Sequence, residues 1–222
     1  MEPLAQSTRL KTIVDPTLER LRLGIRKFQS GVYSQQAETY RLAASRPQEP
    51  HTLIIACADS RVDVETITSA GPGEIFVARN IGNMVPAFGE TPGSVDAVIE
   101  YAVAALKVKH IVVCGHSDCG AMKALLTLPD ISYAYVKKWL THGQAALQVA
   151  LTTHEQHGGD LLKTLTHQNV LMQMAHLRTH PHVAGALARG TLSLSGWVYD
   201  IGSGSVDICD AVSDRAFETL QA

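Results

Sequence analysis

Two short apolar runs constrain this chain more than any other feature, because each leads directly into chemically reactive side chains. The first run, residues 53–56, is too short for a helix, rich in β-branched and aliphatic residues and preceded by Pro50, which is typical of a buried strand. Cys57, Asp59 and Arg61 follow it at alternating positions. In open α/β sheets ligands collect at the carboxyl ends of strands, so this trio marks a candidate site.

The second run, residues 111–114, repeats this plan and leads into His116 and Cys119 within a Gly-His-Ser-Asp-Cys-Gly turn. Together with Cys57 this gives one imidazole and two thiols, the borderline-soft donors that zinc takes. Three protein ligands with one position free are typical of a catalytic site, and Asp59 either binds there or lies beside it. The alternative, a structural zinc closed by Asp59, is disfavoured because structural sites are usually closed by cysteine and histidine.

Composition limits the class of protein. At 222 residues the chain is long enough for one domain with a sizeable core. A net charge of -2 without a basic face argues against nucleic-acid and membrane partners, and no apolar run approaches the ~20 residues of a membrane span. The start of the chain lacks a secretory signal, and four cysteines are too few for a disulfide framework. We therefore expect a soluble, cytoplasmic protein.

The order of the predicted elements indicates an α/β fold. Predicted strands alternate with predicted helices, as in a parallel sheet with helices on both faces. Beyond the two strands above, the pattern predicts strands at 74–78, 192–199 and 205–208, and helices at 63–69, 91–106, 120–128 and over most of 129–189.

The beginning of the chain is predicted to be a helical arm. Asp15 followed by Pro16 is typical of a helix start, Gly31 is expected to end that helix, and a second helix covers 37–44. We expect a single domain over 1–222 with a central, mostly parallel β-sheet flanked by helices. Its parts are an N-terminal helical arm (1–46), a catalytic core (47–210) and a C-terminal helix (211–222).

The two ligand motifs, in this order and at this separation, resemble those of the β-class carbonic anhydrases. The resemblance runs from about the first helix to Tyr199 and is carried by residues 57–62, 72–74, 79–80, 115–120 and 196–199. It implies one zinc ion per chain, held by Cys57, His116 and Cys119. It also implies reversible hydration of carbon dioxide to bicarbonate and a proton, by attack of zinc-bound hydroxide.

The resemblance further implies that Asp59 and Arg61 are the catalytic dyad beside the open metal position. Arg61 would hold Asp59 ionised, and the carboxylate would accept the hydrogen of metal-bound water and aim its lone pair at the substrate. If this pair broke, Asp59 would be able to take the fourth zinc position and close the site.

Family members divide into an always-open type and a type that switches to the closed, aspartate-bound form. The switching type carries a tryptophan three residues before the first zinc cysteine and a glycine one residue before it, where this chain has Ile54 and Ala56. Arg79 and Tyr199, which belong to that type's inhibitory bicarbonate pocket, are present. Because the tryptophan is missing, we favour the open type.

Four residues are predicted to form the substrate pocket, three of them from the same resemblance. Gln48, nine residues before Cys57, matches the open type together with Phe76 and Tyr101, and these three would reach the zinc site of a partner subunit. The expected assembly is therefore a homodimer or a homotetramer. Gly120 is the fourth, since it begins the helix behind the ligands, where free N–H groups favour a bound anion.

Two other functions fit the same motifs. Close relatives hydrolyse carbon disulfide or carbonyl sulfide with the same zinc set and differ mainly in access to the metal. A non-catalytic zinc- or bicarbonate-binding homologue would keep the fold and lose turnover, but the intact Asp59, Arg61 and Gln48 argue against it.

The other histidines are not predicted to bind a metal, and a role in relaying protons from zinc-bound water is left open for them. His154 with His157, and His176 with His180 and His182, have spacings that suit a metal, but no acidic or cysteine ligand is evident nearby. Spacing alone has a high false-positive rate, so a solvated helix face or a loop is favoured for them.

Three residues near the motifs receive no catalytic role. Cys114 lies inside an apolar strand, Cys209 alternates with Val206 and Ile208, and both are expected to be small buried side chains. Asp118 lies between the ligands, and no role is predicted for it beyond the turn.

Overall fold

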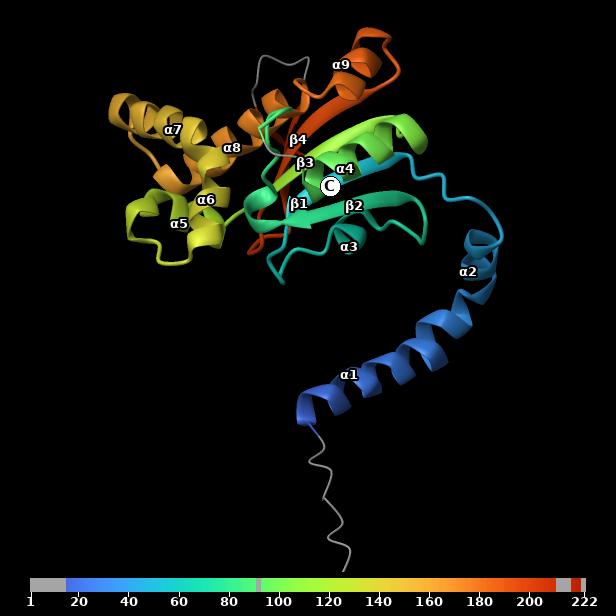
Figure 1. Ribbon diagram of the computed structural model, residues 1–222. Helices are drawn as coiled ribbons and strands as arrows, with labels where there is room; N and C mark the ends of the chain where they lie inside the picture. The colour runs from blue at the N-terminus through green and yellow to red at the C-terminus, as the bar shows by residue number, and fades with distance from the viewer. Residues whose placement is uncertain (1–14, 91–92, 211–216, 221–222) are drawn as a thin grey trace, which may run out of the picture. The chain divides into compact units, whose positions relative to one another are not determined.

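The computed structural model describes residues 15–90, 93–210 and 217–220 (Figure 1). It divides into two compact units, Met1–Pro47 and Gln48–Ala222, and each is described by itself. Among the described helices, none combines the length and apolar character needed to cross a membrane.

The first unit is helical. Helix α1 (Pro16–Lys27) begins where predicted, because the Asp15 carboxylate accepts a hydrogen bond from the Thr17 N–H at 2.8 Å. The expected end at Gly31 is wrong, since a π-helical segment (Phe28–Tyr33) follows and α2 covers Ala37–Ala44. Gly31 does not adopt the positive φ of a helix-ending glycine, so the helical backbone continues.

The second unit is built on one six-stranded sheet in the order β2-β1-β3-β4-β5-β6. Strands β2, β1, β3 and β4 run parallel, whereas β5 and β6 are antiparallel to their neighbours. This confirms the mostly parallel α/β architecture. The strands are β1 (Thr52–Cys57), β2 (Ile75–Asn80), β3 (His110–His116), β4 (Ser193–Tyr199), β5 (Val206–Asp210) and β6 (Glu218–Thr219).

Helices cover the two faces of this sheet unequally. One face carries Leu53, Ile55, Ile111 and Val113 and packs against α4, α8 and α9. The other carries Ile54, Ala56, Val112 and Cys114, and α3 is the helix that packs on it within the described part of this unit. The helices are α3 (Val64–Thr68), α4 (Ser94–Glu100), α5 (Gly120–Leu126), α6 (Ala134–Leu140), α7 (Gln144–His157), α8 (Leu161–Leu177) and α9 (Pro181–Ala188).

A second apolar cluster lies beyond one end of the strands, where α5, α6 and α7 gather (Figure 1). Met84, Met122, Leu125, Leu140 and Leu165 are buried there, and Cys57 and Cys119 belong to the same cluster. Burying each large apolar side chain contributes about 1.5–3 kcal/mol. The cluster therefore encloses the reactive sulfurs at the carboxyl end of the sheet.

Two expected boundaries differ from the structure. Arg79 and Asn80 belong to β2 rather than to a loop, because the parallel register continues to the pair Cys57↔Asn80. The predicted C-terminal helix (211–222) lies partly outside the described residues, and its described part, 217–220, holds strand β6 instead. Thr219 pairs with Asp207, so the free edge of β5 provides backbone partners that a helix would not use.

Close packing of β4 on α8 leads to the first prediction. A Cβ atom at Gly196 would lie 2.5 Å from Val170 Cγ1 and 2.8 Å from Met174 Sδ. Gly196→Ala should therefore lower the free energy of unfolding by about 1–3 kcal/mol, measured by urea denaturation. Gly202→Ala is the matched control, since its nearest neighbour is a side-chain oxygen of Asp200 at 3.4 Å. Equal stabilities for the two variants would contradict this packing.

Candidate metal centre and active site

The carboxyl ends of β1 and β3 bring the predicted metal ligands together. Ala56 pairs with Cys114 in the parallel register, so Cys57 and His116 both lie at the carboxyl end of their strands, on the same side of the sheet's length. Cys119 follows after a two-residue turn and caps α5. Donor atoms of the three residues lie within 4.8 Å of one another, and all three side chains are buried. The three predicted side chains therefore form a cluster that could hold a metal ion.

The imidazole of His116 is oriented as a metal ligand. Its Nδ1 lies 2.8 Å from the Ser117 carbonyl oxygen, which only accepts, so Nδ1 carries the hydrogen and Nε2 keeps its lone pair. This Nε2 is buried and has no hydrogen-bond partner among the described residues. A buried acceptor without a partner is costly, and a metal ion at this position would satisfy it.

The two thiols also suit a cation. Their sulfur atoms are 4.0 Å apart. The hydrogen bond from Cys119, together with the N–H groups of Gly82 and Asp59, lowers the pKa of Cys57. The same hydrogen bond and burial raise the pKa of Cys119. Two buried sulfurs at this distance ionise together only if a cation offsets their charge, so the Cys₂His donor set fits Zn²⁺.

Asp59 and Arg61 form a bidentate ion pair beside these donors. Asp59 Oδ1 accepts from Arg61 Nε at 2.9 Å, and Oδ2 accepts from Nη2 at 2.8 Å. The Arg61 backbone N–H adds a bond of 3.0 Å to Oδ1. Hydrogen bonds from Arg61 hold the pKa of Asp59 well below its usual range. Asp59 Oδ2 also lies 3.9 Å from His116 Nε2, so the carboxylate is close to the metal-donor cluster.

Asp118 is a member of the site that the sequence did not reveal. Its Oδ2 accepts from Arg61 Nη1 at 2.9 Å, and its backbone carbonyl accepts from Nη2 at 3.3 Å. Lys123 Nζ donates to the other carboxylate oxygen. The hydrogen bond from Lys123, followed by that from Arg61, lowers the pKa of Asp118. Arg61 therefore bridges two carboxylates, one on each ligand loop.

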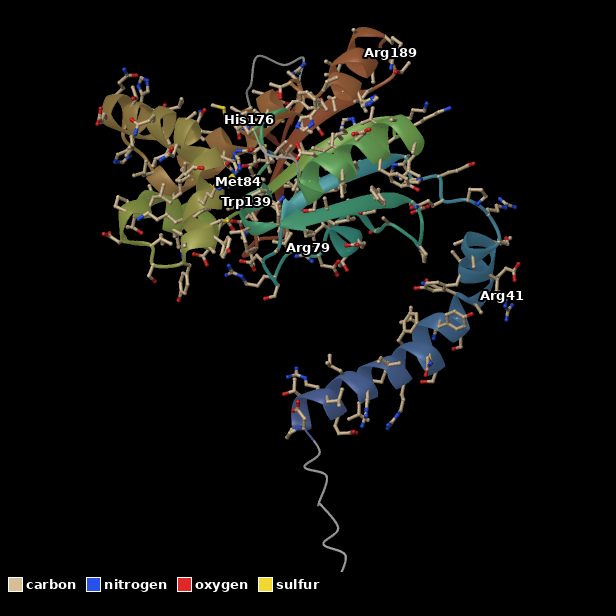
Figure 2. The ribbon with its side chains drawn as sticks, viewed as in Figure 1. Arg41, Arg79, Met84, Trp139, His176 and Arg189 are labelled. Carbon is tan, nitrogen blue, oxygen red and sulfur yellow. The ribbon has the colours of Figure 1, made fainter. Side chains whose placement is uncertain are left out.

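The turn Ile81–Asn83 lies against the sulfur of Cys57 and is fixed from several sides. Trp139 Nε1 donates to the Ile81 carbonyl at 2.8 Å, and Asn169 Nδ2 donates to the Gly82 carbonyl at 3.1 Å. Gly82 adopts a φ of 76°, and a Cβ there would lie 2.8 Å from Ala121 Cβ, so only glycine fits. Figure 2 labels Met84 and Trp139 around this turn.

Arg79 supports the loop that carries the dyad. Its guanidinium donates to the carbonyls of Cys57 at 3.1 Å, Asp59 at 2.7 Å and Val62 at 2.6 Å. Arg79 therefore uses its guanidinium donors to hold the backbone of this loop.

The predicted substrate-pocket residues are only partly near the metal donors of their own chain. Gly120 directly follows Cys119 and has no atom within 4 Å of the position that a Cβ would take, so space is open beside it. Phe76 and Tyr101 contact each other with ring centroids 6.0 Å apart. Phe76 pairs with Leu53, four residues before Cys57, which corresponds to about 13 Å along the strand.

Other histidines hold backbone rather than metal. His176 Nδ1 lies 2.7 Å from the Val85 carbonyl oxygen, and His180 Nε2 lies 3.0 Å from that of Pro86. In the described part of the chain, Cys57, His116 and Cys119 are the group of three donors that lies close enough for a metal ion. The spacings of His154 with His157, and of His182 with its neighbours, therefore produce no second cluster there.

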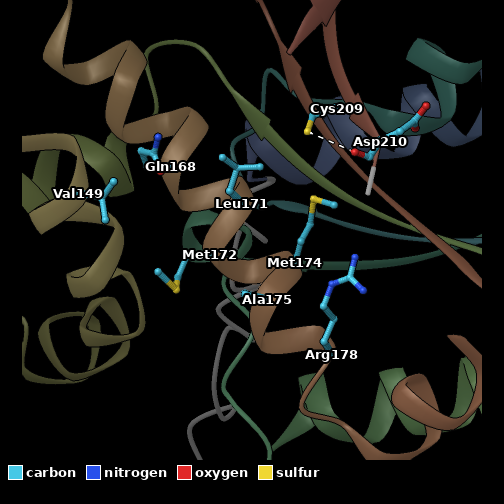
Figure 3. Close-up of a pocket in the computed structure, with 9 residues that line it drawn as sticks. All are labelled: Val149, Gln168, Leu171, Met172, Met174, Ala175, Arg178, Cys209 and Asp210. Carbon is cyan, nitrogen blue, oxygen red and sulfur yellow. Dashed lines mark hydrogen bonds between the residues drawn. The ribbon is translucent and has the colours of Figure 1, made fainter. Parts of the chain in front are cut away.

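A separate cavity of about 450 Å³ lies between α7, α8 and the end of β5 (Figure 3). Asp210 pairs with Ser195 near the start of β4, whereas the metal donors lie at the carboxyl ends of β1 and β3. This cavity therefore lies at the opposite end of the parallel strands from the metal donors. The thiol of Cys209 donates to the Asp210 carbonyl at 3.7 Å. The residues that line the cavity are Val149, Gln168, Leu171, Met172, Met174, Ala175, Arg178, Cys209 and Asp210.

The donor set gives the second prediction. Cys119→Ala should lose at least tenfold in zinc affinity, because only two protein ligands remain. Zinc content after dialysis against a weak chelator measures this. Cys114→Ala is the matched control: this thiol is buried outside the cluster, burial raises its pKa to about 12, and the variant should retain one zinc per chain. Equal zinc retention by both variants would contradict the assignment.

Comparison with known proteins agrees with this geometry. Residues 52–206 match the family model described as carbonic anhydrase. A carbonic anhydrase of Pseudomonas aeruginosa is 47% identical over 195 residues, covering 86% of this chain and 87% of that protein. The solved β-carbonic anhydrase CcaA superposes with a TM-score of 0.88 at 38% identity, covering 94% of both chains. A structure titled as one of two tetrameric β-carbonic anhydrases of Sordaria macrospora has a TM-score of 0.78 at 29% identity, covering 93% of this chain and 100% of that one. This chain therefore belongs to the β-class of the carbonic anhydrase family of enzymes.

Proposed function

We propose that this chain hydrates carbon dioxide reversibly, through one Zn²⁺ held by Cys57, His116 and Cys119 in a permanently open site. One observation carries the proposal. The Asp59 carboxylate is tied to Arg61 at 2.8 and 2.9 Å, yet lies only 3.9 Å from the unpartnered Nε2 of His116. The carboxylate is therefore placed beside the fourth metal position and restrained from entering it.

Each ligand residue has a distinct task in this proposal. A zinc ion in this donor set would lower the pKa of water and so supply a nucleophile near neutral pH. Cys57 and Cys119 offset the charge of the metal. His116 presents Nε2 because Ser117 holds the hydrogen on Nδ1. These thiols must stay reduced, which suits a cytoplasmic location.

Asp59 orients the attacking water and receives its hydrogen bond at Oδ2. Arg61 contributes by keeping the carboxylate ionised and by fixing its direction through two parallel hydrogen bonds. The open space beside Gly120 is where carbon dioxide would lie, next to a water that Asp59 would orient. Bicarbonate formed there would meet the N–H groups at the start of α5.

We infer that the remaining pocket residues come from a partner subunit. Phe76 and Tyr101 pack against each other, and Tyr101 is 49% exposed. Phe76 lies several residues away from the carboxyl end of the strands, where the metal donors of the same chain lie. A second copy of the chain would cover this aromatic pair and place it, with Gln48, at a neighbouring zinc site. The tetrameric relative from Sordaria macrospora supports a homodimer or homotetramer.

The test of this function is stopped-flow hydration of carbon dioxide at pH 7, on protein whose zinc content is measured in the same preparation. Activity proportional to zinc is expected. A zinc-loaded protein that is inactive at pH 7 but active above about pH 8 would contradict the open type. No activity with carbon dioxide, together with sulfide release from carbon disulfide, would contradict the substrate.

The third prediction concerns the dyad. Asp59→Ala should retain zinc and lower kcat by about a hundredfold, because the orienting acceptor is lost. Asp130→Asn removes an exposed carboxylate elsewhere and should change kcat by less than twofold. Full activity in Asp59→Ala would rule out the dyad.

The fourth prediction concerns the partner subunit. Asp59→Ala and Gln48→Ala are each expected to be poorly active alone. Co-expressed in one cell, they should form mixed dimers in which one site has its own Asp59 and the partner supplies Gln48. Random pairing should restore roughly a quarter of the wild-type activity per site. If Gln48 acts within its own chain, mixing restores nothing.

A further inference from the structure

We propose that Asp118 and Lys123 are positioning residues that hold Arg61 on Asp59, and so keep the Asp59 carboxylate out of the fourth metal position. This inference rests on the proposed open-site function and explains what maintains it. Asp118 has hydrogen bonds with Arg61 and Lys123. It acts on Asp59 through Arg61.

The guanidinium of Arg61 uses all of its nitrogen atoms in this arrangement. Nε and Nη2 donate to Asp59, whereas Nη1 donates to Asp118 Oδ2 at 2.9 Å and Nη2 also reaches the Asp118 carbonyl at 3.3 Å. A guanidinium held along two edges is fixed in its plane and in its rotation. Without Asp118 the Nη1 edge would face solvent, since the Arg61 side chain is 45% exposed.

Lys123 prevents competition between the two carboxylates. Asp59 and Asp118 both attract Arg61, and an unbalanced Asp118 would draw the guanidinium away from Asp59. Lys123 Nζ donates to Asp118 Oδ1 and offsets its charge, which leaves Oδ2 to accept from Arg61. Each exposed pair is weak by itself, but the three pairs form one network through a bidentate arginine.

The backbone at Asp118 directs its carboxylate toward Arg61. Asp118 has a φ of 57°, in the left-handed region that glycine, asparagine and aspartate tolerate best. The network therefore links the loop after β3 to the loop after β1. The same φ provides two useful variants, because Asp118→Asn keeps an acceptor oxygen and Asp118→Gly removes it, and both residues accept this backbone conformation.

Loss of the Asp118 acceptor should shift the site toward the closed form. Asp59 has two alternatives, pairing with Arg61 or binding the metal, and it lies 3.9 Å from His116 Nε2 already. An external ligand binds only the open form, so its apparent affinity falls in proportion to the open fraction.

The experiment uses the Co²⁺-substituted full-length protein and azide, followed by the visible absorption spectrum of cobalt at pH 7.5. Asp118→Asn and Asp118→Gly carry the same charge, so their comparison isolates the acceptor oxygen. We expect Asp118→Gly to bind azide about three- to tenfold more weakly than Asp118→Asn. Asp130→Asn, an exposed carboxylate outside the network, should bind as the wild type does.

A second comparison shows whether the effect passes through Asp59. In the Asp59→Ala background no carboxylate competes for cobalt, so Asp118→Gly and Asp118→Asn should then bind azide equally. A persisting difference in that background would overturn the inference, because the effect would not depend on Asp59. Equal affinities in the native background would also overturn it. Failure of the wild-type protein itself to bind azide, with binding in Asp59→Ala, would instead contradict the open site.

Discussion

The site depends on β1 and β3 being adjacent and parallel. Because Ala56 pairs with Cys114, Cys57 and His116 lie one and two residues further along their strands and emerge at the same end of the sheet. The Cys119 sulfur joins them after a single tight turn. Burial of these three side chains in the apolar cluster beyond the sheet then makes the pair of thiols dependent on a compensating cation. Strand register thus determines the ligand set, and packing determines how strongly the site requires a metal.

The segment from Ile81 to Pro86 shows how the surrounding helices serve this edge. Apart from the pair formed by Asn80 with Met84, its backbone is bound by side chains from α6 and α8 and by His180, which precedes α9. Trp139, Asn169 and His176 donate to its carbonyls, and Gln173 accepts from the Val85 N–H at 2.8 Å. Buried backbone groups need such partners. Polar side chains and histidines of this half of the chain are therefore used as structural donors.

Local features of the sequence predicted most of the fold and the donor set. A short apolar run followed directly by Cys57, or by His116 and Cys119, contains both the strand and the ligands within about ten residues. Features that depend on distant partners were not predictable in this way. Asp118 meets Arg61 across 57 residues, and β6 exists because β5 offers a free edge. Propensity likewise did not show that helical backbone would continue past Gly31.

The three bonds from Arg79 connect the dynamics of an edge strand to those of the reactive loop. Strand β2 pairs on one side only in the described sheet, and edge strands are the first elements to fray. Arg79 nevertheless links β2 to the carbonyls of Cys57, Asp59 and Val62. Local unfolding of β2 would release that loop, so amide hydrogen exchange in β2 and the lifetime of the assembled site should share one opening event. An edge strand thereby limits how long the centre stays intact.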